Sequence, residues 1–231
     1  MLKLENVSFS YGAIKTLHQV NMVMEPRRIT CVMGRNGVGK TTLMKNIMGI
    51  LRANSGNIWL EDKDIRPLPA NKRAKAGVGL VPQGRHIFPK LTVEENLRVG
   101  LEARTDGKRT IPGEVYDLFP VLKTMSKRRG GDLSGGQQQQ LAIARVLVGD
   151  PKVILLDEPT EGIQPNIIEK IGMVLRDLVA EKNVAVVIVE QFLDFVKEFG
   201  HSFYIMNRGA VVAEGATTEM TESLIAAHLH V

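Results

Sequence analysis

The sequence predicts an α/β fold, in which short buried strands alternate with helices. Apolar segments rich in β-branched residues, at residues 29–33, 153–156 and 184–189, are typical of strands buried on both faces. Helical periodicity follows the first two strands, at residues 42–48 and 167–180, and a glycine-rich loop joins the first strand directly to its helix. With 231 residues, the chain is long enough for one sizeable core, or for a core with a smaller lobe attached.

The first helix should bury one face, formed by Leu43, Ile47 and Ile50. The other elements expected in this half of the chain are strands at residues 4–9 and 17–24, joined through Tyr11 and Gly12, and strands at residues 56–60 and 76–81, the last ended by Pro82.

A helical region is predicted from Thr92 to about Val148, because Thr92 followed by Glu94 and Glu95 is typical of a helix N-cap and its first turn. The polar stretch at residues 103–113 interrupts this region and is expected to be an exposed loop. Near the C-terminus, residues 203–206 and 210–214 should form a hairpin that turns at residues 207–209.

Composition restricts the classes of function. Hydrophobic residues make up 44% of the chain and charged residues 24%, values typical of globular proteins. The net charge of +5 comes from scattered basic residues without an aromatic-interleaved stripe, so no nucleic-acid partner is expected. The single cysteine, Cys31, is expected to fill the core in a reducing compartment. His228 and His230 are expected to lie in a solvated tail rather than in a metal site.

Segments that cross or enter a membrane are not predicted. The N-terminus lacks the charged and apolar regions of a signal peptide. Apolar runs such as residues 153–156 are far shorter than the roughly 18–20 residues that span a bilayer. If the protein works on a membrane, another chain is expected to supply the spanning part.

The loop after the first buried strand fits the phosphate-binding pattern G-x-x-x-x-G-K-S/T. Its glycines allow backbone N–H groups to converge on a phosphate, and the helix N-terminus adds a favourable dipole. Lys40 is expected to reach the β- and γ-phosphates, and Thr41 to offer its hydroxyl to Mg²⁺. The predicted nucleotide-binding residues of this loop are Gly34, Arg35, Asn36, Gly37, Val38, Gly39, Lys40, Thr41 and Thr42. A nucleoside triphosphate is therefore the expected ligand.

Two acids, Asp157 and Glu158, end the strand at residues 153–156. At the carboxyl edge of an α/β sheet they would lie beside the bound phosphates. Asp157 is then placed to hold Mg²⁺ opposite Thr41, and Glu158 to act as the general base for an attacking water. A strand that ends in acids is weak evidence alone, and it is the loop upstream that favours this interpretation.

A second glycine-containing segment begins at Ser134 and opens a helical run at residue 141. Its residues allow either a second anion site at a helix N-terminus or an ordinary capped helix with a polar first turn. The predicted ligand-binding residues of this segment are Ser134, Gly135, Gly136 and Gln137.

In its motifs and in their order, the chain resembles the ATP-binding cassette (ABC) ATPases over essentially its whole length. Ser134 to Gln137 match the signature loop of that family, and the order is phosphate loop, signature loop, Asp-Glu strand. The resemblance implies a single P-loop NTPase domain over residues 1–231, with a RecA-like core and an N-terminal antiparallel β subdomain. It also implies a helical signature subdomain inserted at about residues 86–150.

The resemblance also implies roles for individual residues. Gln83 matches the glutamine that contacts Mg²⁺ and the attacking water, and Tyr11 the aromatic residue that stacks on adenine. A tyrosine of a hairpin turn is the alternative for Tyr11. Gln191 stands where the family has its switch histidine, and Gln164 where it commonly has an aspartate. The amide of Gln191 is expected to make a neutral contact to the γ-phosphate, worth about 1 kcal/mol.

Function and partners follow from the same resemblance. The expected function is that of the ATPase subunit of an importer, with ATP and Mg²⁺ as its nucleotide and metal. The expected partners are two transmembrane permease subunits, a second ATPase subunit (a copy of this chain or a sister chain) and, indirectly, a periplasmic solute-binding protein. The expected location is the cytoplasmic face of the inner membrane. A soluble ABC protein acting on DNA or ribosomes and a non-hydrolysing scaffold are the other candidates.

The solute is predicted from the particular residues found within these motifs. The segments at residues 34–40, 81–89 and 91–97 resemble the branched-chain amino acid and urea uptake branch of the family. The interior of the phosphate loop, Arg35 to Val38, and the Pro82 to Arg85 sequence favour its urea or short-chain amide members. Branched-chain amino acids are the second candidate.

Overall fold

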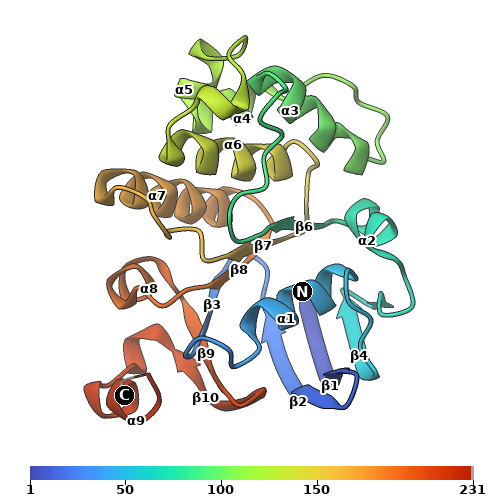
Figure 1. Ribbon diagram of the computed structural model, residues 1–231, viewed down its shortest axis with the longest axis vertical. Coiled ribbons are helices and arrows are strands. Elements are labelled where there is room, and N and C mark those ends of the chain that lie inside the picture. The colour runs from blue at the N-terminus through green and yellow to red at the C-terminus, as the bar shows by residue number, and fades with distance from the viewer. Residues whose placement is uncertain (230–231) are drawn as a thin grey trace.

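Two sheets and the helices packed around them make up the computed structural model, which describes residues 1–229 (Figure 1). His230 of the expected tail lies outside these residues. The larger sheet has the strand order β10-β9-β3-β8-β7-β6, in which all neighbouring pairs are parallel except β10 with β9. Its strands are β3 (Ile29–Met33), β6 (Val78–Val81), β7 (Val153–Asp157), β8 (Ala185–Val189), β9 (Ser202–Asn207) and β10 (Ala210–Ala216).

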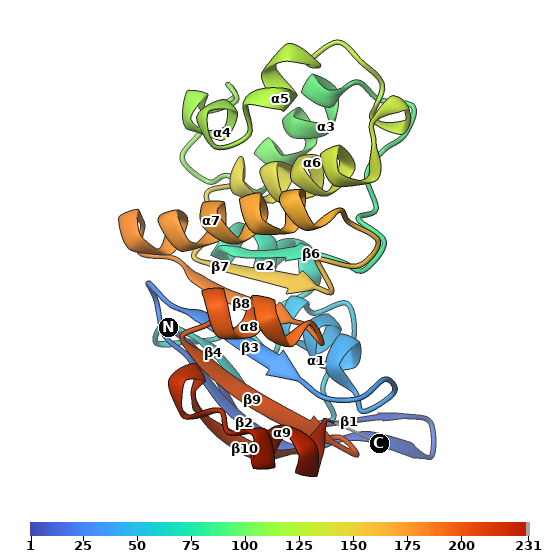
Figure 2. The ribbon, with the colours of Figure 1, turned by 90° about the vertical axis from the view of Figure 1, so that its left-hand side faces the viewer.

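The smaller sheet is antiparallel and lies at the opposite end of the molecule from helices α3 to α6 (Figure 2). Its order is β2-β1-β4-β5, and its strands are β1 (Leu2–Tyr11), β2 (Ile14–Met24), β4 (Ser55–Leu60) and β5 (Lys63–Asp64). The helices are α1 (Lys40–Met48), α2 (Ala70–Ala76), α3 (Val93–Gly100), α4 (Gly113–Leu118), α5 (Pro120–Thr124), α6 (Gly135–Leu147), α7 (Pro165–Glu181), α8 (Leu193–Phe199) and α9 (Glu222–His228).

The central strands are buried on both faces, as their apolar sequences predict. In β3, Cys31 packs into the core shared with α6, α7 and α8, whereas Val32 packs into the core shared with α1 and the antiparallel sheet. Helix α1 is thus held between the two sheets. This arrangement fixes the N-terminus of α1 beside the carboxyl ends of β3, β7 and β8.

Several predicted boundaries are corrected by the structure. Ile50 lies beyond the end of α1, because Gly49 caps the helix at φ +80°, and its side chain is 55% exposed instead of buried with Leu43. The strand predicted at residues 76–81 begins only at Val78. Residues before it form helix α2, which ends at Gly77 with φ +110°. Helices α8 and α9 were not predicted from the sequence, since each has only seven residues and a short periodic pattern.

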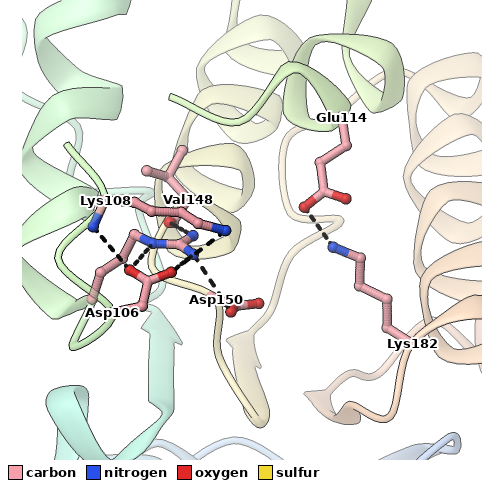
Figure 3. Close-up of polar contacts among 7 residues, drawn as sticks. Asp106, Lys108, Glu114, Val148, Asp150 and Lys182 are labelled. Atoms are coloured by element: carbon pink, nitrogen blue, oxygen red, sulfur yellow. Dashed lines mark hydrogen bonds and ion pairs between the residues drawn. The ribbon is translucent and has the colours of Figure 1, made fainter. Parts of the chain in front are cut away.

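The expected exposed loop after α3 is held in place by polar contacts (Figure 3). Arg104 donates from Nε to Oδ1 of Asp106 at 2.9 Å and from Nη1 to the carbonyl of Val148 at 3.1 Å. The hydrogen bond from Arg104 holds the pKa of Asp106 below its usual range. Beyond the loop, Lys182 at the end of α7 donates to Glu114 of α4 at 2.6 Å. The contacts of Arg104 hold the region between β6 and β7 together internally, and the Lys182–Glu114 contact ties that region to α7.

The capping signals at Thr92 are confirmed. The backbone N–H of Thr92 donates to Oε2 of Glu95 at 2.7 Å, and the backbone N–H of Glu95 donates back to Oγ1 of Thr92 at 3.2 Å. The hairpin turn at residues 207–209 also forms where it was predicted, between β9 and β10. In the part of the chain that the structure describes, no helix has both the length and the apolar character needed to cross a bilayer.

Candidate active site

The phosphate loop begins where β3 ends, and its glycines adopt conformations that other residues rarely take. Gly34, Gly37 and Gly39 have φ of +143°, +80° and +109°. A Cβ at Gly34 would overlap the carbonyl oxygen of Met206 in the neighbouring strand β9. Glycine is therefore needed here both for the backbone conformation and for the close approach of a second strand.

Lys40 opens α1 and folds back over the loop. Its Nζ donates to the carbonyl of Gly34 at 2.6 Å and to that of Arg35 at 2.9 Å. Only 5% of Lys40 is exposed, and burial lowers the pKa of its ammonium group. The charges of nearby carboxylates act in the opposite direction, and these belong to Glu158, Asp157 and Glu190. The loop thus holds a buried cation at the point where the sequence predicts the phosphates.

Asp157 and Thr41 face each other across the loop. The Thr41 hydroxyl donates to Oδ1 of Asp157 at 3.3 Å, and Asp157 is 3% exposed. Burial raises the pKa of Asp157, an effect that the Thr41 hydrogen bond partly offsets. A hydroxyl and a carboxylate so close together are oxygen ligands of the kind that Mg²⁺ prefers, so these residues fit the ion.

Glu158 has the left-handed backbone conformation, with φ +50°, and its N–H donates to the carbonyl of Val189 in β8 at 3.0 Å. Both oxygens of its carboxylate accept from amide side chains. Gln83 donates from Nε2 to Oε2 at 2.9 Å, and Gln191 donates from Nε2 to Oε1 at 2.9 Å. The same nitrogen of Gln191 also donates to Oδ1 of Asn36 in the phosphate loop at 2.8 Å. Gln83 and Gln191 therefore meet at the carboxylate of Glu158, and Gln191 links that carboxylate to Asn36 of the phosphate loop.

These groups surround a cavity of about 350 Å³. Its lining residues are Thr16, Asn36, Gly37, Gly39, Lys40, Thr41, Thr42, Gln83, Glu158 and Glu161. The sequence did not predict Thr16 or Glu161. Glu161 accepts a hydrogen bond from Nε2 of Gln83 at 3.1 Å, and its position directly after the Asp-Glu strand was the only available signal.

Ser134 lies elsewhere, at the N-terminus of α6. Its backbone N–H donates to Oε1 of Gln137 at 2.9 Å, and its hydroxyl accepts from the N–H of Gln137 at 3.4 Å. The segment from Ser134 to Gln137 lines a different cavity of about 840 Å³, together with residues of α5 and α7. The structure therefore separates this segment from the phosphate loop, and the capped-helix alternative describes its local geometry.

Tyr11 ends β1 and is 47% exposed. Its ring packs edge-on against Phe9, with centroids 4.8 Å apart. It is not among the residues that line the cavity at Lys40. An exposed ring supported by a second ring is available for stacking.

This chain is similar in sequence to a known family and to proteins of that family. A model of the family described as "ABC transporter" matches residues 17–161. The chain is 38% identical to the "high-affinity branched-chain amino acid transport ATP-binding protein BraG" of Pseudomonas aeruginosa, covering 92% of this chain and 91% of that protein. It is 34% identical to the "probable branched-chain amino acid transport ATP-binding protein LivF" of Archaeoglobus fulgidus, covering 96% and 94%.

Solved structures of ATP-binding cassettes are also similar to this chain. A dimeric post-hydrolysis state of an ATP-binding cassette bound to ADP and Pi matches with a TM-score of 0.84 at 27% identity, covering 94% of this chain and 99% of that chain. A nucleotide-free ATP-binding cassette from an ABC transporter matches with a TM-score of 0.83 at 28% identity, covering 99% and 94%. The predicted cassette fold, α/β with an antiparallel β subdomain and additional helices, is confirmed.

Proposed function

Because this chain belongs to the ABC transporter family, we propose that it is the ATP-hydrolysing subunit of a solute importer. ATP hydrolysis with Mg²⁺ is characteristic of the family. The observation that carries the proposal for this chain is the carboxylate of Glu158, held by the amides of Gln83 and Gln191 in the cavity that also contains Lys40.

Lys40 binds the β- and γ-phosphate oxygens in place of the two carbonyl oxygens that it now contacts. Thr41 and Asp157 hold Mg²⁺, which offsets the negative charge of the phosphates. Tyr11 stacks on the adenine ring. Together these contacts orient the terminal phosphate toward Glu158.

Glu158 accepts a proton from water as the water oxygen attacks the γ-phosphorus. The bond from that phosphorus to the β–γ bridging oxygen breaks, and ADP leaves with the electron pair. Gln83 and Gln191 bring amide groups to the same point, where they orient the water and the γ-phosphate. Since an amide does not titrate, Gln191 makes a neutral contact throughout the cycle.

A second ATPase subunit completes the site. Ser134 and its neighbours line a cavity separate from the phosphate loop, which supports the proposal that they contact a nucleotide held by a partner. Contacts from both faces of the nucleotide favour a closed pair, and hydrolysis opens it. The segment after Gln83 passes this motion to two permease subunits at the cytoplasmic face of the membrane, which take up solute from a periplasmic binding protein.

Residues 1–231 act as one domain, with helices near residues 86–150 as its signature subdomain.

Branched-chain amino acids are the favoured solute, since two relatives that cover over 90% of this chain carry that description. The interior of the phosphate loop, Arg35 to Val38, still favours urea or a short amide as the second candidate. Solute recognition belongs to other chains, so this subunit limits the choice only through its resemblance to relatives.

Two measurements test the proposal. Phosphate release from MgATP by the purified chain should be lost in Lys40→Ala, and a wild-type chain that releases no phosphate alone or with its permeases would contradict the ATPase assignment. Proteoliposomes that contain this chain with its partner permeases should then take up leucine, and not urea, when ATP is present on the ATPase side. Uptake of urea alone would instead favour the second candidate.

A further inference from the structure

Glu190 directly follows β8 and has a buried carboxylate, with only 4% of the residue exposed. Its Oε1 accepts from the backbone N–H of Gln191 at 2.8 Å and from that of Phe192 at 3.1 Å. Its Oε2 accepts from the hydroxyl of Thr160 at 2.7 Å. Among residues 1–229, no basic side chain lies within ion-pair distance of it.

A buried carboxylate without an adjacent cation is costly, and it is retained where its hydrogen bonds fix a geometry. Here each of its three acceptor contacts goes to a neutral donor, and each donor belongs to a segment that borders the active site. Lys40 contributes only a longer-range attraction. The contacts therefore indicate what Glu190 holds in place.

On one side, Glu190 fixes the turn that aims Gln191. With both N–H groups held on Oε1, the side chain of Gln191 extends to Oε1 of Glu158 at 2.9 Å and to Oδ1 of Asn36 at 2.8 Å. An amide that is free to rotate would lose one or both contacts. Glu190 thereby limits where the amide of Gln191 can point.

On the other side, Glu190 holds Thr160, which begins the loop at residues 160–164. That loop contains Gln164, which stands directly before α7 and lines the same cavity as Ser134. One carboxylate therefore joins the glutamine beside the base to a loop that borders the signature segment.

We propose that Glu190 is a positioning residue for ATP hydrolysis, which holds Gln191 against Glu158 and couples it to the loop at residues 160–164. Its role is to fix geometry through hydrogen bonds, and it neither touches the nucleotide nor exchanges protons. The inference rests on the proposed role of Glu158 as the general base.

The first test compares three variants by steady-state kinetics. Glu190→Ala should lower kcat by about 10–100-fold, the scale of a misplaced catalytic group, and change the KM for ATP by less than about threefold. Glu190→Gln should restore kcat to within about threefold of wild type, because its amide oxygen accepts both N–H groups and its NH₂ donates to Thr160. Glu219→Ala is the matched control. That carboxylate also accepts a backbone N–H, at 3.1 Å from Ala216, but lies far along the chain from the site, and kcat should be unchanged.

The second test is a double-mutant cycle with Gln191→Ala. If Glu190 acts through Gln191, the loss from Glu190→Ala should fall to less than about threefold in the Gln191→Ala background, since contacting residues are not additive. A full, additive loss would contradict the positioning role. If Glu190→Ala fails to fold, Thr160→Val replaces it in the cycle, because it removes the hydroxyl bonded to Oε2 at nearly constant volume.

Two further outcomes would overturn the inference. An unchanged kcat in Glu190→Ala would show that the contacts are not needed, and a Glu190→Gln variant as impaired as Glu190→Ala would show that charge, not hydrogen bonding, matters. Wild type and Glu158→Gln are assayed in parallel. Absence of hydrolysis in wild type, or normal hydrolysis in Glu158→Gln, would contradict the proposed function instead of the role of Glu190.

Discussion

Gln191 donates from Nε2 to Oε1 of Glu158 at 2.9 Å, which places an amide against the proposed general base. With Gln83 on Oε2, both oxygens of the carboxylate are engaged. A water that approaches Glu158 therefore meets both amides, which are close enough to orient it.

Glu158→Gln should bind ATP normally but lose turnover, because the amide cannot accept the proton from water. General-base catalysis is worth about 10²–10⁴-fold, so kcat for phosphate release should fall by about that factor. With ATP and Mg²⁺ the variant should also accumulate as a closed dimer on size-exclusion chromatography. Glu161→Gln is the control, since Glu161 shares the Gln83 contact without being the proposed base. Near-normal hydrolysis by Glu158→Gln would contradict the assignment.

Gln191→His should make kcat depend on pH in a way that wild type does not. Free imidazole has a pKa of about 6.5, so the variant carries a cation below that pH and can make a charge-assisted contact to the γ-phosphate. The ratio of variant to wild-type kcat should therefore rise between pH 8 and pH 6. A ratio that stays constant over this range would mean that the side chain at residue 191 does not face the phosphate.

Tyr11→Ala should raise the KM for ATP with little effect on kcat. Stacking of a base on an aromatic ring contributes about 1–3 kcal/mol, which corresponds to roughly 5–150-fold in affinity. Tyr11→Trp keeps a ring at the end of β1 and should leave the KM near that of wild type. If the KM of Tyr11→Ala were unchanged, the tyrosine would be no more than a hairpin residue packed on Phe9.

Asp157→Asn should stabilise the protein when no metal or nucleotide is present. Burial raises the pKa of Asp157, so its charged form is less favourable in the folded chain than in the unfolded chain. The folded state then binds the proton more tightly than the unfolded state. The stability of the fold therefore falls as pH rises from the pKa of Asp157 in the unfolded chain through its raised pKa in the folded chain. The melting temperature of Asp157→Asn should exceed that of wild type at pH 7.5, and the gap should narrow as pH falls. A gap that widens in acid would contradict this sign.

Gly34→Ala should destabilise the fold more than Gly37→Ala in the same loop. A methyl group at Gly34 would overlap the Met206 carbonyl, whereas a methyl group at Gly37 has nothing within 4 Å and adds only the strain of its φ. Overlap in a packed site costs about 1–3 kcal/mol beyond the strain, and each kcal/mol lowers the melting temperature of a chain of this size by roughly 2–4 °C. Thermal unfolding followed by circular dichroism measures both variants. Equal melting temperatures would contradict the close approach of β9.

The sequence predicted much of the fold because its signals are local. The strands β3, β7 and β8 are buried along their whole length and almost entirely apolar, and a strand buried on both faces shows that pattern whatever lies around it. The cap at Thr92 and the turn at residues 207–209 depend on neighbours within a few residues. Short helices such as α8 lack enough turns to show a period, and Ile50 was misplaced because one glycine ends α1.

Within the site, the sequence by itself determined which residues form the phosphate loop and which acids end the neighbouring strand, since the loop and the Asp-Glu strand are contiguous motifs. Only the tertiary structure decided that Gln83, Gln191 and Glu158 meet. Their contacts join residues 33 and 75 positions apart. The same holds for Glu190 and Thr160, 30 positions apart, where a buried acid after β8 looked in sequence like any strand end. Hydrogen bonds between two segments depend on how strands pair across a sheet. The residues of one segment alone do not determine that pairing.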